Sequence, residues 1–235
     1  MLNGLYKVEI DGASGSGRGV MVVRDGHLFG GNAAFALAGR SLESGQDIAV
    51  DITTVQRNDG LGFKPVAGVG KVALRGRREG GDRYRFEGGT ALLAGAPFTV
   101  VMTAISEEAV PPAGANGADG IRNGLYSLHI RMLDGIDSGN TGLMVLHEGS
   151  IRGGDAHFDY VGAYSSAKGR WKGELINRTH TPTMGQRPLF GDREVGIGFS
   201  GTYDEHGAEG EATALAGKRS IRFKAVLRKL VDIEG

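Results

Sequence analysis

The sequence predicts an all-β chain of two tandem antiparallel β-barrels, and two observations lead to this fold class. The first is an internal duplication, in which "MVVRDGHLFGGNAAF" at 21–35 and "MVLHEGSIRGGDAHF" at 144–158 are identical at seven of fifteen positions. The second is a series of short alternating segments at about ten-residue spacing, joined by glycine-rich turns. A barrel is favoured over a sandwich because closure removes exposed strand edges.

The duplication runs through the whole chain in a constant order. "NGLY" begins at Asn3 and at Asn123, and "KPVAG" at Lys64 matches "RPLFG" at Arg187. The distance between matching motifs is much longer than the repeat unit of a solenoid. The duplication therefore predicts two homologous domains, over residues 1–106 and 123–235.

The segment between the two copies, "EEAVPPAGANGADGIR" at 107–122, is rich in Pro, Gly and Ala and has no apolar alternation. It is predicted to be a linker. The alternative is a loop inside a single domain, which would be unusually long for a compact fold.

The duplicated stretch itself predicts a β-hairpin in each copy. A strand-like run meets Asp25-Gly26 or Glu148-Gly149 and then resumes, and the glycine can supply the positive φ that a tight turn needs. The Gly-Gly pairs that follow, Gly30 with Gly31 and Gly153 with Gly154, are interpreted as structural turns or bulges rather than as a phosphate cradle.

Other strands are predicted from apolar alternation. Tyr6, Val8 and Ile10 share one face, as do Tyr126, Leu128 and Ile130 in the second copy. The further predicted strands are 48–52, 71–75, 84–87, 98–105, 171–177, 195–199 and 221–230. Interior candidates that would either fill a barrel or line a pocket are Leu5, Ile52, Val100, Leu175 and Ile197.

Composition narrows the functional classes. Lys+Arg and Asp+Glu both number 27, so no net charge favours nucleic acid or an anionic membrane. There is no cysteine for a disulfide or a thiolate metal site, and no signal peptide or membrane-length apolar run is visible. We therefore expect a cytoplasmic protein.

Catalytic motifs are not evident, and no catalytic residue, cofactor or metal is predicted. Gly70-Lys71 and Gly217-Lys218 lack the Ser or Thr of a phosphate-binding loop, and "LHEGS" lacks the second histidine of a zinc-protease helix. Because no set of nucleophile, base and orienting group is visible, the chain is predicted not to be an enzyme.

Two polar clusters leave alternatives open. His157 with Asp155 and Asp159 is read as the solvated face of a strand rather than as a metal site. The segment "NRTHTPTMGQRP" at 177–188 carries Arg178 and His180 and is either a polar connection or a loop that closes over a ligand. The corresponding stretch of the first copy keeps Arg57 but has no histidine.

The "GLY" strands and the hairpins ending in Gly-Gly resemble the GrlR family, small bacterial regulators known for negative control of type III secretion. The resemblance covers both copies and is closer in the second, over "MVLHEGSIRGGDAHFDYVGAY". It implies a lipocalin-like β-barrel of eight strands with a largely apolar interior. It also implies protein binding, since the founding regulator sequesters a transcriptional activator through an acidic run after the hairpin. The first copy offers Glu43 and Asp47 there, and the second copy has no acidic residue in the matching stretch.

Two functional hypotheses follow from this reading. The first is a regulatory protein that binds a protein partner such as a transcriptional regulator, as a monomer that reproduces a dimer within one chain or as a homodimer. The second is a carrier or sensor of a small apolar ligand, because eight-stranded barrels can enclose one molecule. A cavity above about 300 Å³ would favour the carrier.

Overall fold

The structure is a computed structural model, which describes residues 2–13, 15–66, 70–89, 97–108, 110–133, 137–183, 188–191 and 193–233. Its described part consists of β-strands and connections. The chain divides into two units, Met1–Ser106 and Glu107–Gly235. No helix among these residues is long and apolar enough to cross a membrane.

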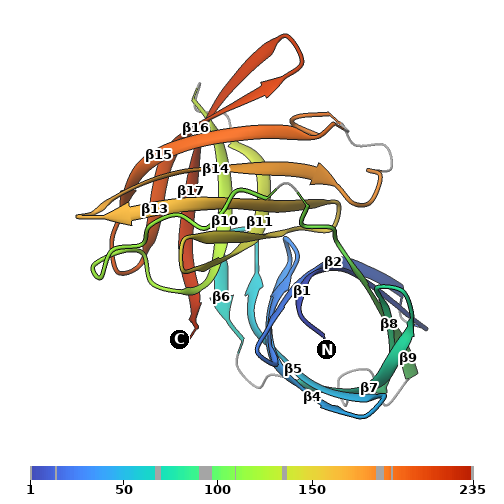
Figure 1. Cartoon of the computed structure of the whole chain (residues 1–235). Coiled ribbons are helices and arrows are strands. Elements are labelled where there is room, and N and C mark those ends of the chain that lie inside the picture. Colours follow the sequence, from blue (N-terminus) through green and yellow to red (C-terminus); the bar gives the residue numbers. More distant parts are fainter. Residues whose placement is uncertain are drawn as a thin grey trace. The chain divides into compact units, whose positions relative to one another are not determined.

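The first unit is a closed antiparallel barrel, drawn from blue to green in Figure 1. Its strands are β1 Gly4–Gly12, β2 Gly15–Arg24, β3 His27–Gly31, β4 Phe35–Ser44, β5 Asp47–Asn58, β6 Phe63–Pro65, β7 Lys71–Gly80, β8 Arg83–Gly89 and β9 Pro97–Ala104. Pairing of β4 with β5 closes a ring of eight strands, and the short β6 adds to the end of β5.

The second unit is also a closed barrel of eight strands, in consecutive order. Its strands are β10 Gly124–Met132, β11 Asp137–His147, β12 Ser150–Gly154, β13 Phe158–Ala167, β14 Arg170–Thr179, β15 Val195–Tyr203, β16 Gly207–Ala216 and β17 Arg219–Asp232. The prediction of two tandem antiparallel β-barrels is therefore confirmed.

The repeated hairpin joins β2 to β3 and β11 to β12. Asp25 and Glu148 have φ values of 49° and 46°, and the glycines that follow them have φ values of 77° and 79°. Two consecutive residues with positive φ form the turn type that matches the twist of a two-residue hairpin.

Strand alternation places one apolar face of each strand inside its barrel. In the first unit, Tyr6 packs edge-on against Tyr84 with ring centroids 5.8 Å apart. The buried core is Leu2, Tyr6, Val8, Met21, Val23, Leu28, Ile48, Val50, Leu74, Tyr84, Phe86, Val100 and Met102. Leu5, a candidate for the interior, precedes Tyr6 and lies on the opposite face of β1.

The segment predicted as a linker contacts the second barrel. Backbone amides of Gly114 and Gly117 donate hydrogen bonds to the carbonyls of Gly149 and Ser166, at 3.1 and 2.8 Å. Asn116 forms a parallel bridge with Ser166. These residues thus belong to the second unit.

Candidate functional site

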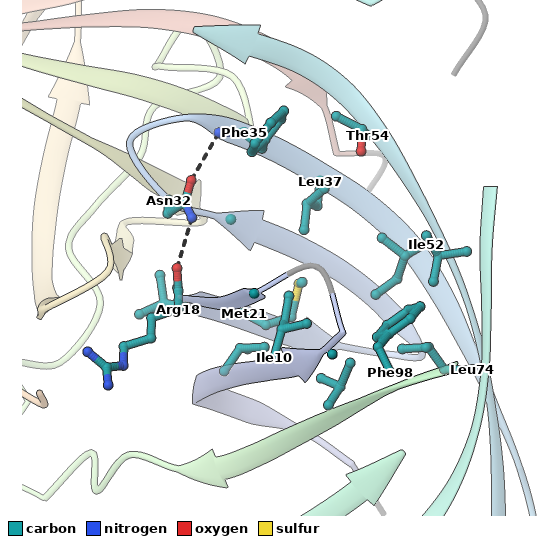
Figure 2. Close-up of a pocket in the computed structure, with 18 of the residues that line it drawn as sticks. Ile10, Arg18, Met21, Asn32, Phe35, Leu37, Ile52, Thr54, Leu74 and Phe98 are labelled. Atoms are coloured by element: carbon teal, nitrogen blue, oxygen red, sulfur yellow. Dashed lines mark hydrogen bonds between the residues drawn. The ribbon is translucent and has the colours of Figure 1, made fainter. Parts of the chain in front are cut away.

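The interior of the first barrel contains a cavity of about 410 Å³. Figure 2 shows its walls, formed by apolar side chains from six different strands. The labelled apolar residues are Ile10, Met21, Phe35, Leu37, Ile52, Leu74 and Phe98. The cavity reaches one end of the barrel, where Gly12 and Gly15 flank the β1–β2 turn and Phe35 begins β4.

Two residues that line the cavity have smaller side chains than their counterparts in the second copy. Leu37 lies between Gly30 and Thr54 in the sheet, and Tyr160 lies between Gly153 and Asn177 in the same register. A leucine thus stands where the second barrel places a buried tyrosine.

A second position in the cavity wall shows the same difference. Leu74, opposite Gly88, corresponds in the same way to Phe199, opposite Ala212.

Aromatic side chains pack together inside the second barrel. The ring of Trp171 lies 4.5 Å from that of Phe199 and 6.4 Å from that of Tyr164, measured between centroids. Near the barrel end, Phe190 packs 5.6 Å from Phe223. Aromatic contacts of this kind stabilise a packed core beyond simple area burial.

Leu189 and Phe190, which pack against this core, belong to the "RPLFG" segment. The matching "KPVAG" segment carries Val66 and Ala67 in their place, and Ala67 lies outside the described residues.

Polar side chains are few around the cavity of the first barrel. The polar and charged residues that contribute atoms to its wall are Arg18, Asn32 and Thr54. The amide of Asn32 donates to the Arg18 carbonyl at 2.8 Å and accepts from the backbone amides of Ala34 and Phe35 at 2.8 and 3.0 Å. Asn32 therefore holds the β3–β4 turn, as the dashed lines in Figure 2 show for its bonds to Arg18 and Phe35.

Arg57 and Arg178 match in the sequence alignment of the two copies, but they occupy different register positions in the two barrels. Arg57 is exposed on β5, opposite Phe35. Arg178 lies opposite Asp159 on β14, and its Nη2 donates to Asp159 Oδ2 at 2.6 Å. A bulge in β5, where Ala36 pairs with Gln56 but Leu37 with Thr54, shifts the first copy by one residue.

The Asp159 carboxyl is almost fully buried beside Arg178. Burial raises the pKa of Asp159 above 3.8, and the Arg178 guanidinium opposes this shift. The pair is thus a buried structural ion pair between β13 and β14, on the face opposite Tyr160.

His180 and His157 lie together at the ends of β13 and β14. His180 Nε2 is 3.3 Å from the Asp155 carbonyl, and His157 Nδ1 is 3.3 Å from the Thr181 carbonyl. Asp155 Oδ1 accepts from the backbone amides of His157 and Phe158, at 2.7 and 2.9 Å. Among the described residues, no group of three or more His, Cys, Asp or Glu side chains could hold a metal ion.

Glu43 and Asp47, the residues expected to bind a protein partner, are exposed at the β4–β5 hairpin. Glu43 pairs with Ile48, a core residue, so it lies on the inner face, where its carboxylate accepts the backbone amide of Leu2. Asp47 pairs with Ser44 on the outer face. The two carboxylates therefore do not form one acidic surface.

The Gly-Gly pairs occupy close approaches between strands. A Cβ at Gly30 would lie 2.1 Å from the Val20 carbonyl oxygen, and one at Gly153 would lie 2.1 Å from that of Leu143. Gly31 and Gly154 end their strands with φ values of 129° and 151°.

No protein-family model matches the chain, and a search of curated proteins finds no similar sequence. The resemblance to the GrlR family thus stays a prediction. The cavity of the first barrel, whose size is not evident from the sequence, is the candidate functional site.

Proposed function

We propose that the chain is a binding protein that holds one small apolar molecule inside the first barrel. The observation that carries this proposal is the cavity of about 410 Å³, whose walls are almost entirely apolar. Cavities for small ligands typically begin at about 300 Å³ and are lined mainly by hydrophobic residues.

Displacement of water supplies the driving force for binding. At about 30 Å³ per water molecule, the cavity has room for roughly a dozen waters. Side chains such as Ile10, Leu37 and Phe98 offer these waters no hydrogen bonds. An apolar ligand returns the waters to bulk solvent and buries apolar surface, which favours binding.

The alternative, a regulator that binds a protein partner, stays a prediction. The cavity does not bear on it, and Glu43 and Asp47 lie on opposite faces of their hairpin. We therefore place the ligand carrier first.

The proposal is tested with N-phenyl-1-naphthylamine, an uncharged dye that fluoresces in apolar surroundings. The intact chain is compared with Leu37→Tyr, which introduces the residue that the second copy carries at this position. We expect Leu37→Tyr to bind the dye at least tenfold more weakly, because the added ring occupies the cavity.

Leu37→Met is the matched control, because it keeps side-chain volume and apolar character. It should bind the dye within about threefold of the wild type. Circular dichroism establishes that both variants are folded. Equal dye binding by wild type and a folded Leu37→Tyr chain would rule out the cavity as the site.

A further inference from the structure

The charge distribution around the cavity restricts the chemistry of its ligand. Arg18 is the one ionisable residue among those that line it in the described part of the chain. Arg18 pairs with Glu9 across β1 and β2, whereas Val8 and Ile10, which flank Glu9, line the cavity. Strand alternation therefore directs the Arg18 side chain to the outer face.

Figure 2 agrees with this reading, since the guanidinium of Arg18 points away from Ile10, Met21 and Phe98. Arg18 contributes its backbone to the wall, where its carbonyl accepts the Asn32 amide. Its charge does not reach the interior in this structure.

The remaining polar side chains of the wall, Asn32 and Thr54, are uncharged.

A carboxylate carried into such a cavity would lose its hydration without gaining a cationic partner. Transfer of an unpaired ion into an apolar environment is far more costly than transfer of a hydroxyl or ester group. The ligand would have to protonate first or keep its head group outside the barrel, and both requirements weaken binding.

We infer that the first barrel selects uncharged apolar molecules, such as fatty alcohols and esters, over carboxylates of the same chain length. This inference rests on the proposed ligand-binding function and specifies its ligand class. It also distinguishes this barrel from a fatty-acid site, in which a buried basic side chain would meet the carboxylate.

The test is competition against N-phenyl-1-naphthylamine on the intact wild-type chain at pH 8, with 1-decanol, methyl decanoate and decanoate. All three competitors share a ten-carbon chain, are used below their aggregation concentrations and differ in the charge of the head group. We expect decanol and methyl decanoate to displace the dye, and decanoate to be at least tenfold weaker than both.

The outcomes separate the two proposals. Decanoate within tenfold of decanol would overturn the inference about charge and leave ligand binding intact. Weak displacement by both decanoate and methyl decanoate would overturn it too, because shape rather than charge would then decide. Absence of dye binding by the wild-type chain would overturn the proposed function itself.

Discussion

Single glycines set the spacing between strands in both barrels. At Gly153 the chain passes so close to β11 that a Cβ would lie 2.1 Å from the Leu143 carbonyl oxygen and 2.9 Å from the Met144 Cα. The obstructing atoms are backbone, so a side-chain rotation cannot relieve the overlap. This requirement gives a physical reason why the duplicated hairpin keeps glycine at Gly30 and Gly153.

Gly153→Ala is expected to lower the free energy of unfolding of the second barrel by about 2 kcal/mol or more, because the strands must separate. Gly198→Ala on β15 is the matched control, since no atom lies within 4 Å of its Cβ position. That variant should stay within about 0.5 kcal/mol of the wild type. Urea denaturation measures both, and equal effects would contradict the role of close approach.

The buried pair of Asp159 and Arg178, by contrast, occurs in the second copy and not in the first. Ala36 and Gln56 occupy the matching register in the first barrel. Burial raises the pKa of Asp159 above its ordinary value of 3.8. The Asp159 carboxyl therefore binds a proton more tightly in the folded chain than in the unfolded chain. The contribution of Asp159 to stability therefore falls as the pH rises from about 3.8 through its folded pKa.

Arg178→Gln should destabilise the second barrel by about 3 kcal/mol at pH 7, because it leaves a buried carboxylate unpaired. The loss should be smaller at pH 4, where Asp159 is more readily protonated. The double variant Asp159→Ala/Arg178→Gln, which installs the residues of the first copy, should recover most of the stability. A double variant as unstable as the single one would exclude the unpaired charge as the cause.

At the scale of elements, the segment before β10 is attached to the second barrel through Ser166. Ser166 is buried, its Oγ accepts the Ile121 amide at 2.9 Å, and its hydroxyl also bonds to Asn116. The neighbouring Ser165 Oγ accepts the Ala115 amide at 3.1 Å in an exposed position.

Ser166→Ala should lower the free energy of unfolding by about 1–3 kcal/mol, because the buried Ile121 amide loses its acceptor. Ser165→Ala should cost less than about 1 kcal/mol, since water can replace the exposed hydroxyl. Hydrogen exchange at Ile121 provides the local measurement. Unchanged protection there in Ser166→Ala would show that the segment is held by other contacts.

The strands and hairpins were predictable because each rests on local signals. Apolar alternation at Tyr6, Val8 and Ile10 and the Asp-Gly turn are visible within a few residues of sequence. The cavity was not predictable in this way, since it depends on which side chains meet across the ring. Alignment of Leu37 with Tyr160 through the duplication could have suggested the cavity, because the smaller residue is in the first copy.

The mismatch between Arg57 and Arg178 has a similar origin. The one-residue bulge in β5 shifts the register, and a single inserted residue changes which side chain faces Ala36 or Asp159. Sequence alignment of the two copies cannot place such a bulge. Site residues near strand ends therefore required the structure.

At the scale of the whole molecule, two barrels of one architecture have different interiors. One encloses a cavity, and the other contains Trp171, the only tryptophan of the chain, in an aromatic core. Tryptophan fluorescence therefore reports the unfolding of the second unit alone.

We expect two unfolding transitions by calorimetry. Addition of 1-decanol should raise the midpoint temperature of the first barrel's transition only, which tryptophan fluorescence does not follow. A ligand at 100 times its Kd stabilises its own unit by about 2.7 kcal/mol. Leu37→Tyr should abolish this shift, while Leu37→Met should keep it. A decanol-induced shift of the Trp171 transition of similar size would contradict binding confined to the first barrel.

Ring closure in the first barrel also bears on how fast a bound molecule exchanges. β4 and β5 are paired from Phe35 opposite Arg57 to Ser44 opposite Asp47, so the wall has no open seam there. Parting these strands would break a row of backbone hydrogen bonds, and the barrel end is the less costly route. Phe35, 43% exposed where the cavity reaches that end, stands on this route. The size of its side chain would then govern the lifetime of the complex separately from the affinity, which the deeper apolar wall determines.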